Sequence, residues 1–196
     1  SAKHDRFVHS LGVFHLGNIA VDALLENFKD NPHWKIRSNN TRYVYWAKNK
    51  VLFLVACLLH DIGHAPFSHS LERFYEYDSP MSGSLEPIGK EFERLMGLNG
   101  LSDTACEDEK AAIRKAAPHE RMSAYLILKD GSPWRTRIES VLNALKAMPF
   151  PEPLEPVIGE YDKEFPKINS EDLEEDLRFI ARMIMGVKYR NFEPEK

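Results

Sequence analysis

The junction between the apolar run VLFLVACLL (51–59) and the stretch HDIGHAPFSH (60–69) constrains the fold more than any other part of the sequence. Apolar residues on every side predict a helix over about 47–61 that is buried all round. Titratable side chains at the end of a buried segment cost free energy unless something pairs with them. The sequence therefore predicts a buried helix that delivers a cluster of polar groups to one place. The groups in question are His60, Asp61, His64 and His69.

The rest of the chain reads as further helices in one domain over residues 1–196, so we expect an all-α fold. Apolar spacing and capping residues predict helices over 8–29, 66–75, 88–96, 118–129, 133–147 and a last one capped by Ser170 and closed by Gly186. Residues 30–44 are expected to form a loop, with a short extended piece at TRYVYW (41–46). Five prolines between 149 and 169 indicate an extended surface connection.

His60 and Asp61 can hold a metal ion or form an ordinary buried hydrogen-bonded pair. Successive helical side chains project about 100° apart, so both can approach one ion from adjacent directions. An imidazole with a carboxylate suits Mn, Fe or Zn and, with more oxygen ligands, Mg. His9, at the start of the first predicted helix, is a third candidate ligand. Gly63 and Pro66 break the helix and turn the chain over the cluster, which favours a site.

Three segments resemble one enzyme family. HDRFVHSLGVFHLG (4–17), LLHDIGHAPFSHSLE (58–72) and PHERMSAYLIL (118–128) are similar to motifs of the HD-domain metal-dependent phosphohydrolases, in particular the deoxynucleoside triphosphate triphosphohydrolase branch. The resemblance implies an HD-type helical bundle with a divalent metal ion, Mn, Fe, Mg or Zn. It implies that His9, His60 and Asp61 are metal ligands.

The same resemblance implies an acid-base set near the substrate phosphates, made by His69, Glu72, His119 and Glu120. His69 and Glu72 are three residues apart and share a helix face, so the carboxylate can orient the imidazole. A histidine held in this way can protonate a leaving oxygen near neutral pH. Taken alone, His119 and Glu120 also fit a surface histidine and a helix-start acid. Arg6 and His64 are expected to contact phosphate oxygens.

The family's second metal-binding aspartate lies in a downstream motif that this sequence does not contain. We expect the chain to end short of it, and the absence of an initial methionine indicates that the natural protein begins upstream. Asp172 or Asp176 could supply the missing carboxylate, although both also fit a solvated helix start.

Other polar or aromatic groups are expected to have structural roles. The sequence predicts packing for His15, surface positions for His4 and His33, a solvated helical face over 107–115, and packing or base stacking for the aromatic residues of 41–46.

The expected reaction is hydrolysis of a nucleotide, with a dNTP giving deoxynucleoside and tripolyphosphate. The alternatives are a nucleoside monophosphate, cyclic nucleotide or alarmone as substrate, or a catalytically silent nucleotide-binding module. A net charge of −4 argues against nucleic acid as a partner. The longest apolar run has nine residues, fewer than the roughly 18 that span a bilayer, so no membrane contact is expected. Two cysteines suit a reduced, cytoplasmic protein. The resemblance also implies a homo-oligomer.

Overall fold

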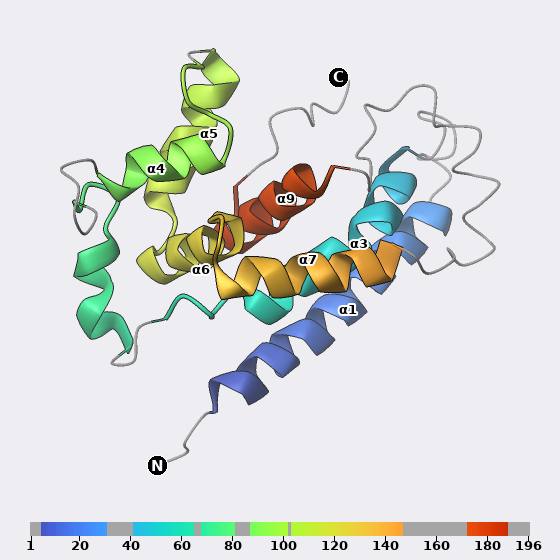
Figure 1. Cartoon of the computed structure of the whole chain (residues 1–196). Helices are drawn as coiled ribbons and strands as arrows, with labels where there is room; N and C mark the ends of the chain where they lie inside the picture. Colours follow the sequence, from blue (N-terminus) through green and yellow to red (C-terminus); the bar gives the residue numbers. More distant parts are fainter. Residues whose placement is uncertain are drawn as a thin grey trace.

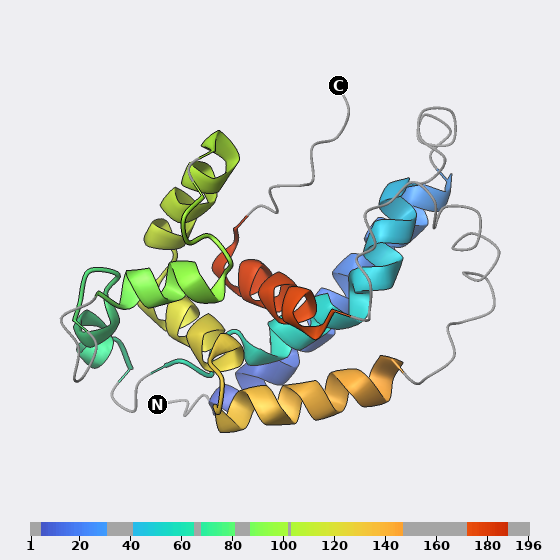
Figure 2. The ribbon, with the colours of Figure 1, turned by 45° about the horizontal axis from the view of Figure 1, so that its top comes forward.

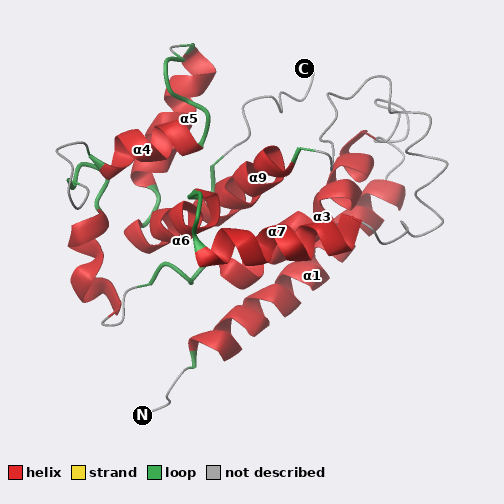
Figure 3. Ribbon diagram, in the orientation of Figure 1, coloured by secondary structure: helices red, strands yellow, loops and turns green. Residues whose placement is uncertain are grey.

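The computed structural model describes residues 5–30, 41–64, 68–80, 87–101, 103–146 and 172–187, which are mostly helical (Figures 1 and 3). The helices are α1 (Arg6–Asp30), α3 (Thr41–Leu59), α4 (Ile88–Leu95), α5 (Thr104–Lys115), α6 (Pro118–Leu128), α7 (Pro133–Lys146) and α9 (Leu173–Met185), with one 3₁₀ helix, η1 (Ser68–Tyr75). Within these ranges the only β pairing is an isolated bridge between Pro80 and Pro87. The all-α prediction is confirmed.

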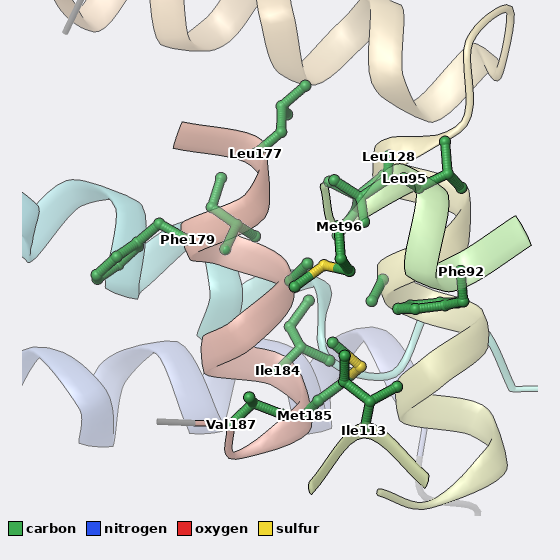
Figure 4. Close-up of a cluster of buried hydrophobic side chains, with 14 of the residues drawn as sticks. Phe92, Leu95, Met96, Ile113, Leu128, Leu177, Phe179, Ile184, Met185 and Val187 are labelled. Carbon is green, nitrogen blue, oxygen red and sulfur yellow. The ribbon is translucent and has the colours of Figure 1, made fainter. Parts of the chain in front are cut away.

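The apolar core is built around α9, which packs against α6 on one side and α3 on another (Figure 2). Leu177, Ile180 and Ala181 of α9 have no exposed surface. Figure 4 shows the buried side chains of α9 beside those contributed by α4, α5 and α6, including Phe92 and Ile113. This core holds α6 and the end of α3 in fixed relation to each other.

Helix α1 lies along α3, and among the described residues much of its surface is exposed. Val21 is buried, whereas several large apolar side chains of α1 are exposed. These are Phe7, Val8, Leu11, Phe14, Leu16 and Ile19. Residues Arg6–Asn27 are long and apolar enough to cross a membrane, with a mean hydropathy of 1.3, and 11% of the stretch is buried. Length and composition alone do not place a helix in a membrane, and the absence of membrane contact stays a prediction.

The bounds and burial of α3 differ from the sequence-based prediction. The helix begins at Thr41, so the loop over 30–44 and the extended piece at 41–46 are wrong for the residues from 41 onward. Trp46 packs edge-on against Phe53, about two turns further along the same face of α3, with ring centroids 5.9 Å apart. This packing overrides the local turn signals. Val51 is 41% exposed, so α3 is not buried all round. The helix ends at Leu59, before His60 and not after Asp61.

The last helix also begins later than predicted. Asp172, not Ser170, is the N-cap of α9, and its carboxylate accepts the backbone N–H groups of Glu174 and Glu175 at 3.0 and 3.3 Å. Gly186 ends the helix in the left-handed region with φ of 64°, as predicted. The predictions for His4, His33, Pro66 and the proline-rich connection over 149–169 fall outside the described residues.

A buried ion pair joins α5 to α9. The solvated face predicted over 107–115 is present, with Glu107, Asp108 and Arg114 exposed, but the opposite face of the helix is buried. Glu109 accepts a hydrogen bond from Arg182 Nε at 2.7 Å, and the two side chains are 1% and 3% exposed. Cys106, Glu109 and Ile113 share one face of α5, and this face is buried. The charge pattern of α5 suggested solvent, but Arg182 supplies the partner that makes burial of Glu109 tolerable.

Replacing one partner of this ion pair should destabilise the fold strongly. We expect Glu109→Ala to lower the free energy of unfolding by roughly 3 kcal/mol, because it leaves the Arg182 charge buried without its carboxylate. The measurement is urea unfolding followed by circular dichroism. Asp108→Ala, at the exposed neighbouring position, is the control and should change stability by less than about 0.5 kcal/mol. Equal effects of the two variants would contradict the argument.

Candidate metal centre

His60 and Asp61 lie in the turn over residues 60–64 that directly follows α3, which we call the HD turn. The turn is closed by hydrogen bonds from Ile62 N–H to Leu59 O and from His64 N–H to Asp61 O, both 3.2 Å. His60 Nδ1 lies 2.9 Å from the carbonyl oxygen of Cys57. A carbonyl only accepts, so Nδ1 carries the proton and the lone pair of Nε2 faces the site. This is the tautomer that a metal-binding histidine needs.

His9 reaches the same place from α1. Its Nε2 lies 3.2 Å from His60 Nε2 and 3.7 Å from Asp61 Oδ2, while His60 Nε2 lies 3.4 Å from Asp61 Oδ1. All three donor atoms lie within 4.8 Å of one another. The predicted convergence of His9 with His60 and Asp61 is therefore observed, and their mixed nitrogen and oxygen donors fit a divalent transition metal.

A second group of polar side chains surrounds Glu72. One oxygen of its carboxylate accepts hydrogen bonds from His69 Nδ1 at 2.7 Å and from His119 Nδ1 at 2.8 Å. The His64 ring stacks on the His119 ring with centroids 4.0 Å apart. His64 Nε2 also lies 3.7 Å from Asp61 Oδ1, so His64 joins this group to the candidate metal ligands. Elements η1 and α6 thus bring together side chains 47 residues apart.

The charges of this group follow from its surroundings. Burial raises the pKa of Glu72, but the hydrogen bonds from His69 and His119 outweigh burial and hold it below its usual value. Burial, helped by the neighbouring His119, lowers the pKa of His64. Glu72 is therefore an ionised carboxylate near neutral pH. It fixes both imidazoles through Nδ1 and leaves each Nε2 for chemistry.

One predicted site residue, Glu120, and one predicted packing residue, His15, have other surroundings. Glu120 accepts the backbone N–H of Ala117 at 3.0 Å and so closes the start of α6; the structure does not bring it into the Glu72 group. That geometry fits the helix-start alternative. His15 is exposed on α1, so the packing role predicted for it is wrong.

Neither downstream aspartate joins the candidate metal ligands among the described residues. Asp172 is an exposed helix cap, as the solvated alternative predicts. Asp176 is 3% exposed within α9, so it belongs neither to the metal group nor to a solvated helix start.

A family model of the HD domain matches residues 6–183, which includes both groups of side chains. The chain belongs to the HD-domain family. This is a superfamily of metal-dependent phosphohydrolases. The match confirms the resemblance carried by the three sequence motifs.

Curated relatives are similar over parts of the chain. The uncharacterised protein YwfO of Bacillus subtilis is 40% identical over 77 residues, which are 39% of this chain and 14% of that protein. The deoxynucleoside triphosphate triphosphohydrolase SAMHD1 of Homo sapiens is 35% identical over 103 residues, 51% of this chain and 14% of that protein. The Dictyostelium discoideum SAMHD1 homolog is 33% identical over 75 residues, 38% of this chain and 12% of that protein. These matches span about a seventh of each relative. No solved structure matches.

Ser123 holds the HD turn against α6, a role that the sequence did not reveal. Its hydroxyl donates to the carbonyl oxygen of His60 at 2.6 Å and accepts the backbone N–H of Gly63 at 2.8 Å. A Cβ on Gly63 would lie 2.2 Å from Ser123 N and 2.5 Å from His119 O. Gly63 was predicted to break the helix, and the structure shows a further reason for glycine here, because two backbones approach closely. The signal available in the sequence was that Ser123 belongs to the family-like segment PHERMSAYLIL (118–128).

Removing the Ser123 hydroxyl should loosen the HD turn. We expect Ser123→Ala to lower the free energy of unfolding by about 2 kcal/mol, because a buried carbonyl and a buried N–H lose their hydroxyl partner. Chemical denaturation is the measurement. The control is Ser140→Ala on α7, where an exposed hydroxyl donates to Thr136 O, and it should cost less than about 0.5 kcal/mol. A Ser123→Ala protein as stable as the control would refute this role.

The Glu72 hydrogen bonds should make stability depend on pH. The pKa of Glu72 is lower in the folded protein than in the unfolded chain, so its contribution is present above the unfolded value and is lost as pH falls through the folded value. Glu72→Gln should therefore be less stable than the parent by about 1 kcal/mol at pH 7. The difference should vanish at acid pH. Urea unfolding of both proteins from pH 7 down to pH 3 measures it, and a gap that does not narrow would contradict the assignment.

Proposed function

We propose that this chain carries the metal-binding and phosphate-binding groups of a phosphohydrolase whose substrate is a deoxynucleoside triphosphate. The supporting observation is the convergence of His9 from α1 with His60 and Asp61, directly beside the Glu72 group. The candidate metal ligands and the imidazoles bound to Glu72 are then close enough to act on one substrate. SAMHD1, named a deoxynucleoside triphosphate triphosphohydrolase, aligns with half of this chain and supports this class of substrate.

His9, His60 and Asp61 would hold the divalent metal ion. When bound, such an ion lowers the pKa of water and polarises a phosphoryl oxygen. The side chain of Asp61 is 15% exposed and that of His9 is 51% exposed, so the donor set is open to a ligand on one side. The identity of the metal, Mn, Fe, Mg or Zn, stays open in this proposal.

The neighbouring side chains account for substrate binding and proton transfer. Arg6 and His64 bind phosphate oxygens, and the guanidinium supplies two parallel N–H donors. Water attacks the α phosphorus and releases a proton to solvent, the bond from phosphorus to the 5′ oxygen breaks, and that oxygen takes a proton from Nε2 of the His69 imidazolium. The products are a deoxynucleoside and tripolyphosphate. His69 is suited to this role because its side chain is 68% exposed while Glu72 fixes its orientation.

The Glu72 carboxylate is the positioning group in this mechanism. It holds His69 and His119 through their Nδ1 atoms, so both Nε2 atoms are directed away from it. Positioning of this kind supplies much of the rate in phosphoryl transfer. Homo-oligomerisation and a cytoplasmic location stay predictions.

The proposal predicts a specific product and specific losses of activity in variants of the site. The full-length protein with added Mn or Mg should convert dNTPs to deoxynucleoside and tripolyphosphate. Asp61→Asn and His69→Gln should each lower kcat by about 10²- to 10⁴-fold, the range expected for a lost ligand or general acid. His15→Gln, an exposed imidazole on the same helix as His9, should keep full activity. Chromatography of the products is the measurement.

Other outcomes of this assay identify the alternatives. Orthophosphate released from monophosphates, or cleavage of cyclic nucleotides or alarmones without tripolyphosphate, would assign the same site to a different substrate. Metal binding with no hydrolysis of any phosphate substrate would make the protein a regulatory nucleotide-binding module. Either result would overturn the proposed dNTP reaction.

A further inference from the structure

A cavity of about 550 Å³ opens beside the HD turn, between the start of α1, the end of α3 and the start of α7. Its volume is within the range of small-molecule sites, roughly 300 to 1,000 Å³. Asp61 and His64 line it together with Arg6, so the cavity includes side chains that the proposed function places around the metal ion and the phosphates.

The rest of the lining is mainly apolar and includes two aromatic side chains. Phe7 comes from α1, Ile62 from the HD turn and Trp134 from the start of α7. Phe7 is 66% exposed and Trp134 is 40% exposed, which leaves much of each ring open to a ligand. A ligand that fills this cavity therefore needs an anionic group and a flat apolar group.

We propose that this cavity binds the nucleobase of the substrate and that Trp134 stacks on it, an inference that rests on the proposed function. A nucleotide carries both required parts, and an indole ring binds the face of any base. The sequence offered the aromatic residues of 41–46 for base stacking. Trp46 packs edge-on against Phe53 instead and does not line this cavity.

Trp134 is held in place by its own helix start. Its backbone N–H donates to Ser132 Oγ at 3.3 Å, and Ser132 N–H donates to Lys129 O at 3.1 Å, which fixes the turn between α6 and α7. The next residue, Arg135, donates to Leu128 O at 2.7 Å. Because the backbone around Trp134 is fixed to α6, little ordering is needed when a base binds.

The test compares ligands with and without a base. The base-containing probe is a dATP analogue with a methylene group in place of the 5′ oxygen, so that the bond expected to break cannot be hydrolysed. The probe without a base is inorganic tripolyphosphate. Isothermal titration calorimetry on the full-length protein with Mg measures both affinities for the parent, Trp134→Leu, Trp134→Phe and Val141→Ala.

We expect Trp134→Leu to weaken binding of the analogue by about 5- to 100-fold, the range that base stacking on an aromatic ring gives. Trp134→Phe should retain most of the affinity because it keeps an aromatic face. Val141→Ala, at an exposed apolar position on the same helix, should bind like the parent. Tripolyphosphate should bind equally well to all four proteins, because it does not reach Trp134.

Three results would overturn the base site: no binding of the analogue to the parent, an affinity of Trp134→Leu within about twofold of the parent, or an equal loss for tripolyphosphate. The hydrolysis assay separates this inference from the proposed function. Analogue binding that depends on Trp134 would support the base site even if no dNTP were hydrolysed. Tripolyphosphate production with an affinity independent of Trp134 would overturn the base site alone.

Discussion

The contact between α1 and α3 is the constraint on which the candidate site depends. A Cβ on Gly17 would lie 2.7 Å from Cys57 Sγ, so glycine lets the two helices approach this closely without a shift of the Cys57 side chain. Burial raises the pKa of the Cys57 thiol, which keeps it neutral and suited to packing. His9 lies about two turns before Gly17, and His60 lies just beyond Cys57. The two helices therefore pack closely at Gly17 and Cys57, and this packing brings the imidazoles of His9 and His60 together near the end of α3.

A second connection adds α6 to this pair. The Ser123 hydroxyl contacts both His60 and Gly63, and the same helix carries His119 to Glu72. A shift of α6 would therefore move the HD turn and the Glu72 hydrogen bonds together. The candidate metal ligands and the acid-base group are thus positioned by one shared packing arrangement, and His64 lies between them with contacts to both Asp61 and Glu72.

The sequence predicted those parts of the structure that depend on local pattern or on a motif. Helix spacing gave the elements, and the family motifs gave the convergence of His9 with His60. Burial of Glu109 could not be predicted, since its partner Arg182 is 73 residues away. Trp134 gave no signal either, because the cavity that it lines together with Phe7 is formed by residues far apart in the sequence. The N-cap of α9 was predicted as Ser170 but is Asp172, because several nearby residues can cap a helix equally well.

The core and the candidate site are separable in energetic terms. Many of the most buried apolar side chains, such as Phe92, Ile113 and Ile180, and the Glu109 ion pair lie on α4, α5, α6 and α9. In contrast, the side chains of His9 and His69 are 51% and 68% exposed. Replacing an exposed imidazole opens little cavity and buries no unpaired charge, which are the main sources of large destabilisation. A loss of activity in a His9 or His69 variant with unchanged thermal unfolding therefore reports on chemistry. Ser123 and Gly63 differ from these histidines. The contact between them both packs α6 and fixes the HD turn, so a variant at either position would change stability and site geometry together.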